Sequence, residues 1–212
     1  MLNAFQRRDE EKRFVKEGRL PPGQALTRKF PVLQYGSVPT LSTDDWTLRI
    51  YGQVEEEVTL TWEQFDALPK TRVLMDLHCV TRWSKMDTLW EGVTLKTLIN
   101  EGILKPMPMA RYLMQHAAPQ YTVNLPIEVA MGDNFLLATL YNGQPIPVDH
   151  GYPVRAVIGA IPGRSDLNVP YLWKGAKWLT GLEFLARDHH GYWEQAGYHN
   201  EADVWKEQRF AD

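Results

Sequence analysis

The 212-residue sequence contains a single cysteine, Cys79. One cysteine cannot form an intramolecular disulfide, so the composition gives no reason to expect an oxidising compartment. The chain also lacks an excess of positive charge, because 23 Lys and Arg face 26 Asp and Glu for a net charge of −3. General binding of nucleic acid is therefore not expected, since no surplus of cations can neutralise a run of phosphates.

Long apolar runs are missing as well. The longest, Phe135–Tyr141, is far shorter than the roughly 20 residues that a membrane-spanning helix needs. Arg7 and Arg8 could open a twin-arginine export signal, but charged residues occupy positions 9–12, where the apolar part of the signal would lie. We expect no membrane segment and a cytoplasmic protein.

Glycine-rich phosphate-binding loops are the third absence, since neither GxGxxG nor GxxxxGK[ST] occurs.

Strand patterns dominate the sequence. We expect strands at residues 46–51, 72–80, 111–116, 135–141, 154–158 and 177–185. Short helices are expected over 61–68, opened by a Thr61–Gln64 capping box, and over 95–101, capped by Thr94. This mixture predicts an α+β, β-rich mixed domain and not a doubly wound parallel sheet.

The chain divides into two parts by composition. Residues 1–20 are dense in charge and predict a mobile or surface-draped N-terminal arm. A Pro-Pro-Gly sequence at 21–23 opens the folded part, so residues 21–212 are predicted to form one domain. Its end, residues 188–210, mixes aromatic and charged residues and is expected to pack its rings over the domain or over a partner.

Cys79 lies in the segment His-Cys-Val-Thr-Arg-Trp-Ser at 78–84. Strand alternation places it on one face with Val73, Met75 and Leu77, which is typical of a small buried apolar residue. Nearby cations such as Arg82 would instead favour the thiolate, the form that attacks electrophiles and binds metals. The segment alone leaves both interpretations open.

Two further segments carry candidate binding residues. His150 lies in a turn and Arg155 near the start of a strand, so that both could face one opening. Taken alone, this segment favours the more ordinary interpretation, a solvated loop histidine and an arginine paired with an acidic residue. The second segment, 173–178, reads Trp-Lys-Gly-Ala-Lys-Trp. Lys174 and Lys177 around Gly-Ala can form a compact anion site, with tryptophans as walls for a planar ligand.

Together these segments resemble the molybdopterin-binding domain of the sulfite oxidase-like molybdenum oxidoreductases, in particular the short bacterial members. The resemblance extends from about Leu20 to Phe210. It rests on LPPGQALTRKFPVLQYG at 20–36, HCVTRWS at 78–84, WEGVTLKTLI at 90–99, HGYPVR at 150–155, WKGAKWLTGLEF at 173–184 and GYWEQAGYHNEADVWKEQRF at 191–210.

The resemblance implies a molybdenum–molybdopterin cofactor with one pterin per metal, and the thiolate of Cys79 as a molybdenum ligand. A soft thiolate suits a metal that already binds sulfur. His150 and Arg155 would contact the pterin, while Trp173, Lys174 and Lys177 would hold the pterin phosphate and its surrounding edge. The implied cofactor-binding residues are Gln34, Tyr35, His78, Thr81, His150, Arg155, Trp173, Lys174 and Lys177, and the implied catalytic residues are Cys79 and Arg82.

The expected activity is transfer of an oxygen atom to or from a small sulfur-type substrate, such as sulfite or a sulfoxide. No CxxC set, haem motif or flavin fingerprint is present, so an external electron-transfer partner is expected. The direction of the reaction, the oligomeric state and the presence of a nucleotide on the pterin stay open. Residues 159–172 are expected to form a surface loop; if it covers the pterin edge, Arg164 would affect access.

Two other functions remain alternatives at this stage. A hydrolase could use Cys79 as nucleophile with His78 or His150 as base, although His78 would point to the opposite face of a strand. A non-catalytic carrier of the pterin cofactor would keep the same phosphate-binding residues.

Overall fold

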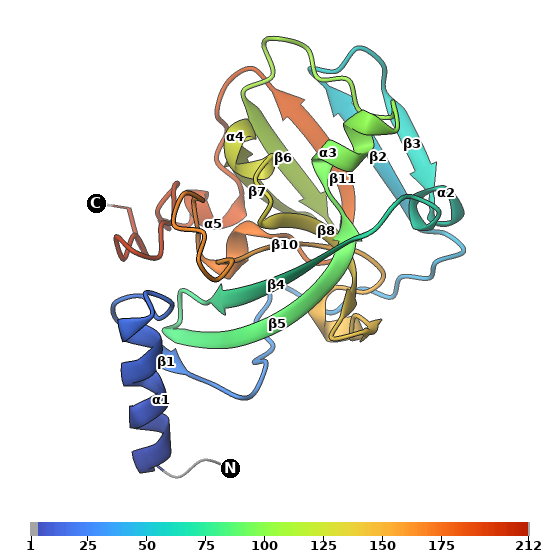
Figure 1. Cartoon of the computed structure of the whole chain (residues 1–212). Helices are drawn as coiled ribbons and strands as arrows, with labels where there is room; N and C mark the ends of the chain where they lie inside the picture. The colour runs from blue at the N-terminus through green and yellow to red at the C-terminus, as the bar shows by residue number, and fades with distance from the viewer. Residues whose placement is uncertain (1–3, 212) are drawn as a thin grey trace.

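The computed structural model describes residues 4–211, which form two β-sheets, one in the lower and one in the upper half of Figure 1. The first sheet has the order β1-β5-β8-β10, with β4 paired to β5 and β9 paired to β8. Its strands are β1 (Ala25–Leu26), β4 (Thr71–His78), β5 (Trp83–Val93), β8 (Phe135–Tyr141), β9 (Gln144–Pro145) and β10 (Arg155–Ile158). The long strand β5 organises this sheet, since it pairs with β1, β4 and β8 along its length.

The second sheet has the order β3-β2-β11-β6-β7. Its strands are β2 (Thr47–Gly52), β3 (Val58–Thr61), β6 (Tyr112–Ala117), β7 (Tyr121–Pro126) and β11 (Leu179–Leu185). The pair β2–β11 is parallel and the other pairs are antiparallel. Such a mixed, strand-rich arrangement with a few short helices confirms the predicted α+β fold class.

Strand β8 shows how the apolar core is built. Its sequence is apolar at nearly every position, and alternate side chains of a strand point to opposite faces. Phe135 and Leu137 join the main core between the sheets, whereas Leu136 and Ala138 join a second core with Trp90 on the other face. A strand that is covered on both sides must be apolar throughout, which explains the run that the sequence shows.

The helices are short except for the first. They are α1 (Ala4–Lys16), α2 (Trp62–Asp66), α3 (Leu95–Asn100), α4 (Ile127–Ala130) and α5 (Tyr192–Gln195), with 3₁₀ turns η1 at Val148–His150 and η2 at Leu172–Lys174. Both predicted helix starts are confirmed. The Thr61 hydroxyl accepts from the Gln64 amide at 3.4 Å while the Gln64 side chain accepts from the Thr61 amide at 2.9 Å. Thr94 caps α3 through the Thr97 amide at 3.0 Å.

The sequence analysis missed β3, β5, β7 and the two-residue strands β1 and β9, and it extended β4 two residues too far, to residue 80. Strand β5 escaped notice because it carries Lys85, Asp87 and Gly92, which are residue types that strands disfavour. It forms because strands on both sides complete its backbone hydrogen bonds. Pairing between distant segments therefore decided this element, and the local pattern did not.

The N-terminal segment contains a helix that the sequence analysis did not predict. Helix α1 has ion pairs one turn apart, from Arg7 to Glu11 at 3.8 Å and from Arg13 to Glu17 at 3.6 Å. Phe14 and Leu20 are buried, at 4 and 6% exposure. The prediction of an arm poor in core residues is thus wrong for these two side chains, while the division of the chain at residue 20 stays a prediction.

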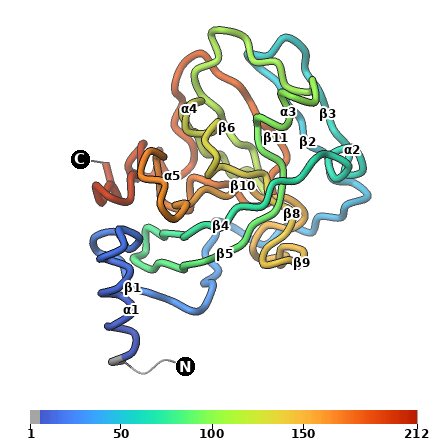
Figure 2. Tube along the Cα trace, viewed as in Figure 1, coloured from blue at the N-terminus to red at the C-terminus, as the bar shows by residue number. Residues whose placement is uncertain are grey.

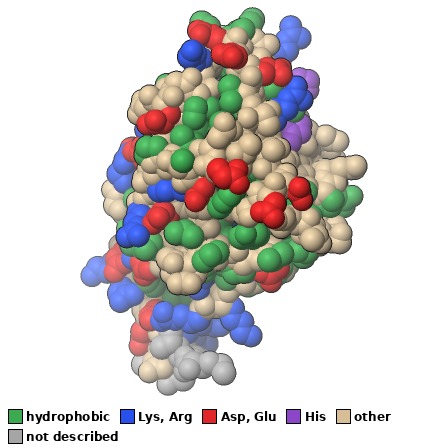
Figure 3. All heavy atoms as spheres, turned by 90° about the vertical axis from the view of Figure 1, so that its right-hand side faces the viewer, with side chains coloured by type: hydrophobic (Ala, Val, Ile, Leu, Met, Phe, Trp, Pro, Cys, Tyr) green, Lys and Arg blue, Asp and Glu red, His purple; other side chains and the backbone are tan. Residues whose placement is uncertain are grey.

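The two ends of the described chain lie on the same side of the molecule, as the blue and red parts of the trace show (Figure 2). Near the C-terminus, Arg209 Nη2 donates to the Gly23 carbonyl at 3.4 Å, so the tail contacts the segment that follows α1. On the face turned to the viewer in Figure 3, basic side chains gather toward the lower end. Among the helices of residues 4–211, none has the length and apolar character needed to cross a bilayer.

Candidate functional site

A pocket with about 670 Å³ of empty space lies where segments from several parts of the chain meet. Its lining includes seven of the residues implied by the sequence: Gln34, Tyr35, Cys79, His150, Arg155, Trp173 and Lys177. The folding of distant segments thus brings most of the predicted site together.

Cys79 enters this pocket from a tight turn between β4 and β5. The Arg82 amide donates to the Cys79 carbonyl at 3.0 Å, and the Cys79 amide donates to the Trp83 carbonyl at 2.9 Å. Arg82 adopts a φ of 73°, so the turn has the form of a type I turn followed by a left-handed residue. The turn ends the strand before Cys79 and separates its side chain from the core cluster of Val73 and its neighbours.

The environment of the thiol differs from the one the sequence suggested. Burial raises the pKa of Cys79, and the Thr81 hydroxyl, 3.2 Å from Sγ, opposes this shift. The cation that also lowers the thiol pKa is Arg209, from the far end of the chain. The guanidinium of Arg82 instead lies 4.0 Å from Glu207, and Lys85 donates to the Arg28 carbonyl at 2.7 Å.

Two cations of the pocket are bound only to backbone oxygens. Arg155, which is 2% exposed, donates to the carbonyls of His150 at 3.0 Å and Ala156 at 3.2 Å. Lys177 donates to the Asp149 carbonyl at 2.8 Å. Neither forms an ion pair with a carboxylate of the described chain. Burial lowers the pKa of Arg155 to about 10, and burial together with the Arg155 charge lowers the pKa of Lys177 to about 7. An anion in the pocket would relieve this uncompensated charge.

Unpaired polar atoms also surround the pocket. Trp83 Nε1, Trp173 Nε1 and His150 Nδ1 are buried and have no hydrogen-bond partner within residues 4–211. Buried donors normally find a partner. The His150 ring stacks on Phe30 at 3.8 Å, and burial, with the nearby Arg155 charge, lowers its pKa to about 4, so the ring is neutral. Unpaired donors between aromatic walls suit a planar ligand rich in nitrogen and oxygen acceptors.

Four of the predicted residues do not line the pocket. Lys174 is 1% exposed, and its ammonium donates to Glu194 at 2.6 Å and to Asn124 at 2.7 Å, beneath α5. The sequence placed both lysines of 173–178 at one anion, but only Lys177 faces the pocket. Lys174 ends the 3₁₀ turn η2 and is buried against Glu194 and Asn124, whereas Lys177 lines the pocket.

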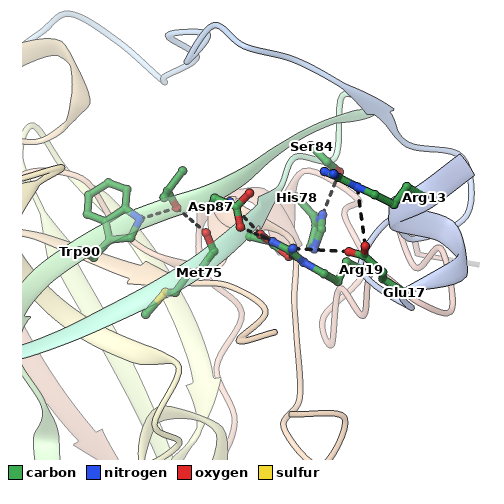
Figure 4. A network of polar contacts seen from close by, with 10 residues as sticks. Arg13, Glu17, Arg19, Met75, His78, Ser84, Asp87 and Trp90 are labelled. Atoms are coloured by element: carbon green, nitrogen blue, oxygen red, sulfur yellow. Dashed lines mark hydrogen bonds and ion pairs between the residues drawn. The ribbon is translucent and has the colours of Figure 1, made fainter. Parts of the chain in front are cut away.

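The other three lie in or next to the turn at residues 79–82, which carries Cys79 and is called the cysteine turn below. His78 points toward Ser84 and Arg19 on the side of α1 (Figure 4), with Nδ1 2.8 Å from the Ser84 hydroxyl. Burial lowers the His78 pKa to about 3, so its ring is neutral. Thr81 contacts the thiol, and the Arg82 side chain extends to the surface. Arg164 does not reach the pocket either, because it pairs with Asp166.

Several aromatic residues of the pocket were missed as site residues. Phe30, Trp83, Tyr121 and Trp193 all line it, as does Trp178, which the sequence had offered as a wall for a planar ligand. Trp83 and Trp178 stand beside predicted site residues, so their proximity in sequence was a usable signal. Tyr121 lies on β7, which the sequence analysis missed, and its hydroxyl donates to the Trp173 carbonyl at 2.8 Å. Only tertiary structure brings this ring to the site.

Comparison with known proteins defines the class to which this pocket belongs. Residues 35–193 match the family model of the oxidoreductase molybdopterin binding domain. The chain belongs to this family of sulfite oxidase-like molybdenum enzymes and is an oxidoreductase whose cofactor is molybdenum–molybdopterin. The match covers most of the folded chain and confirms the predicted family and cofactor.

The relatives span very different lengths. The chain is 38% identical to the uncharacterized oxidoreductase YuiH of Bacillus subtilis, with 92% of this chain and 93% of YuiH aligned. It is 25% identical to the mitochondrial sulfite oxidase of Drosophila melanogaster over 80% of this chain and 32% of that enzyme. The sulfane dehydrogenase SoxCD of Paracoccus pantotrophus shares the fold, with a TM-score of 0.60, 22% identity and alignment of 71% of this chain and 40% of that structure.

Proposed function

We propose that this oxidoreductase transfers an oxygen atom to or from a small sulfur compound, with the Cys79 thiolate as the protein ligand of molybdenum. The observation that carries the proposal is the pocket itself, which joins the only thiol of the chain to two cations that lack a carboxylate partner in the described residues. The names of two relatives, a sulfite oxidase and a sulfane dehydrogenase, support sulfur as the substrate element.

The residues of the pocket fit this cofactor. Arg155 and Lys177 would hold the phosphate of the pterin, since a guanidinium and an ammonium without counter-ions form strong charge-assisted hydrogen bonds to it. The free N–H groups of Trp83 and Trp173 would donate to acceptors of the ring system. His150 and the predicted contacts Gln34 and Tyr35 complete the wall.

The cysteine turn prepares the thiol for a metal. When bound, the molybdenum–pterin group supplies a centre that changes oxidation state by two electrons and takes up or releases one oxygen atom. Cys79 must lose its proton to bind such a metal, and the Thr81 hydroxyl at 3.2 Å can donate a hydrogen bond to the sulfur once it is a thiolate. Arg82, at the end of the same turn, is proposed to act on the substrate.

Lys174 supports the pocket from behind in this proposal. Its carbonyl accepts from Gln115 at 2.8 Å, and the Gln115 side chain in turn accepts from the Ala176 amide at 2.9 Å. The 173–178 segment is thereby fixed to β6 while Lys177 faces the cofactor. We further propose that electrons reach the centre from an external redox partner.

The proposal predicts about one molybdenum per chain in protein purified from a host that synthesises the cofactor, measured by mass spectrometry of the metal. Cys79→Ser should abolish turnover, assayed with a redox dye against sulfite, methionine sulfoxide and nitrate, and should change the spectrum of the metal. Thr81→Ser keeps the turn hydroxyl and is the matched control, with activity retained.

Full activity of Cys79→Ser would contradict the ligand assignment. Turnover of nitrate alone would contradict the substrate class. A protein that binds molybdenum but turns over none of the substrates would support the non-catalytic carrier, whereas rapid alkylation of Cys79 in a folded, molybdenum-free protein from the same host would support the thiol hydrolase.

A further inference from the structure

An open groove separates α1 from the first residues of β5, at the lower end of the molecule in Figure 1. One face of α1 forms the first wall, because the helical residues that line the groove recur at the spacing of a turn, at positions 6, 7, 10, 13 and 14. Residues 26–29 and 85–87 form the opposite wall. The groove also has an apolar part, since Phe14 is buried and Leu26 and Met86 are half-buried.

The groove carries a surplus of positive charge, although the net charge of the chain is −3. Two carboxylates line it, Glu10 and Asp87. Five cations line it as well, and these are Arg7, Arg13, Arg28, Lys29 and Lys85. Both carboxylates already accept from an arginine, Glu10 from Arg28 at 2.6 Å and Asp87 from Arg19. Basic side chains gather toward the same end of the molecule in Figure 3, so the surplus is local to this region.

The two arginines that α1 contributes are only loosely paired. Arg7 lies 3.8 Å from Glu11, and Arg13 lies 3.6 Å from Glu17. Both distances exceed those of well-formed charge-assisted hydrogen bonds. Six residues of helix separate the two arginines, which corresponds to about 9 Å along the axis. One small anion does not span this length, whereas the acidic surface of a protein does.

The second wall of the groove continues into the pocket that contains Cys79. Lys29 is exposed and forms no ion pair with any residue that the structure describes. The next residue, Phe30, lines the pocket, where its ring stacks on His150 at 3.8 Å. Lys85 and Trp83 point to the same side of β5, since they are two residues apart in a strand. Lys85 lines the groove and Trp83 lines the pocket. A molecule in the groove therefore lies next to the aromatic wall of the pocket.

We propose that this groove is the docking surface for an electron-carrier protein with an acidic surface, which exchanges electrons with the centre in the adjacent pocket. Complementary charge accelerates the encounter of two proteins and fixes their orientation. That the partner carries electrons rests on the proposed function, whereas its acidic surface follows from the groove. Nucleic acid fits less well, because the chain as a whole is negatively charged.

The electrons of the proposed reaction balance with a one-electron carrier that docks twice in each turnover. Two reduced carriers and two protons convert a sulfoxide to a sulfide and one water. In the opposite direction, water supplies the oxygen atom that converts sulfite to sulfate, two oxidised carriers each accept one electron, and two protons are released. The same docking surface serves both directions.

Binding of a bacterial flavodoxin, an acidic one-electron carrier, tests the proposal. Calorimetry is performed on the cofactor-loaded protein at about 100 mM salt, where the Debye length is about 10 Å. The groove variant, Arg7→Gln with Arg13→Gln and Lys29→Gln, should bind flavodoxin at least about tenfold more weakly. The control variant, Arg8→Gln with Lys12→Gln and Lys16→Gln, loses the same charge from the opposite face of α1. It should change the affinity by less than about twofold.

Turnover with a redox dye shows that the groove variant is folded. The substituted side chains are exposed and none of them lines the pocket, so dye-linked turnover should be unchanged. With flavodoxin in place of the dye, the concentration that gives half the maximal rate should rise at least about tenfold. Equal affinity of flavodoxin for the wild type and both variants would overturn the proposal, as would an absence of flavodoxin binding to the wild type. Binding to vesicles of anionic phospholipid that is lost in the groove variant, without flavodoxin binding, would overturn it in favour of a lipid surface.

The same titration separates the docking surface from the proposed function. Groove-dependent flavodoxin binding by a protein that takes up no molybdenum in a competent host would leave the docking surface standing and remove the proposed function. A molybdenum-loaded protein that turns over sulfite or a sulfoxide with the dye, but binds flavodoxin equally in the wild type and the groove variant, would do the reverse.

Discussion

At the scale of the residue, Lys177 shows a conflict between stability and function. Its ammonium lies beside Arg155 in a pocket where backbone carbonyls are its hydrogen-bond acceptors. Burying two like charges without a counter-ion costs free energy. A protein optimised for stability alone would have an apolar side chain in place of one of these cations. The pair is explained if a bound anion supplies the negative charge that balances them.

The lowered pKa of Lys177 gives a prediction with a definite sign. The folded, cofactor-free protein releases the proton near pH 7, and the unfolded chain releases it only near 10.5. Between these pH values the unfolded state binds more protons than the folded state, so the free energy of unfolding increases as the pH rises. Below about pH 7 the folded protein carries the full cost of burying the charged ammonium. Lys177→Met should therefore stabilise the cofactor-free protein more at pH 6 than at pH 10, measured by urea unfolding.

The cofactor-loaded protein should respond in the opposite sense. With phosphate bound, Lys177 is charged and paired, so Lys177→Met should lower both the melting temperature and the molybdenum content. A stabilising effect that is equal at both pH values, or equal with and without cofactor, would show that Lys177 does not carry the uncompensated charge of this pocket.

At the scale of the element, the contact between the N-terminal segment and β4 depends on a buried carboxylate. Asp76 is fully buried. Arg19 donates two hydrogen bonds of 2.8 Å to its carboxylate. Arg19 also donates to Asp87 (Figure 4). The hydrogen bond to Asp76 raises the pKa of Arg19 further. The Asp87 amide donates to the same carboxylate at 2.9 Å, so Asp76 joins the N-terminal segment to β5 as well.

Arg19→Met should destabilise the protein by about 3 kcal/mol, because it leaves the Asp76 carboxylate buried without its cation. Guanidinium chloride unfolding measures this change. The matched control is Arg49→Met, which removes an exposed arginine bound to Glu57 at 2.8 Å and should change the unfolding midpoint little. Similar effects of the two substitutions would mean that the buried pair is not what fixes α1 to the sheet.

At the scale of the whole molecule, the C-terminal tail packs against the segment that forms one wall of the pocket. Lys174 and Glu194 form a fully buried ion pair at 2.6 Å between the pocket segment and α5. Burial lowers the pKa of Lys174, and Glu194 opposes this shift. Beyond α5, Tyr198 packs against Trp173 with ring centres 5.7 Å apart, and Arg209 reaches the cysteine turn. The tail is therefore part of the pocket's support, as its aromatic composition suggested.

Glu194→Met should cost about 3–5 kcal/mol, since it leaves the Lys174 ammonium buried without its carboxylate. The double substitution Lys174→Met with Glu194→Met should recover most of that loss, because apolar side chains of similar volume replace a buried pair at little cost. Chemical unfolding of the two single variants and the double variant measures the coupling between the residues. Additive losses would show that the pair does not act as a unit.

The sequence by itself determined the features that depend on residues close together along the chain. A continuous apolar run indicated β8, and capping residues indicated the starts of α2 and α3. The motifs around Cys79, His150 and Lys177 were sufficient to indicate the family and its cofactor. The Thr61 cap is the clearest case, because its partners lie three residues apart and need nothing else from the fold.

Only the tertiary structure decided features that depend on distant partners. Lys174 turns away from the pocket because it pairs with Glu194, a residue of α5, and Lys177 has no such partner in the described chain. Strand β5 forms because other strands pair with it. The approach of Arg209 and Glu207 to the cysteine turn joins residues more than 120 positions apart. The direction of a charged side chain follows from which buried partners satisfy it, and spacing along the chain does not contain that information.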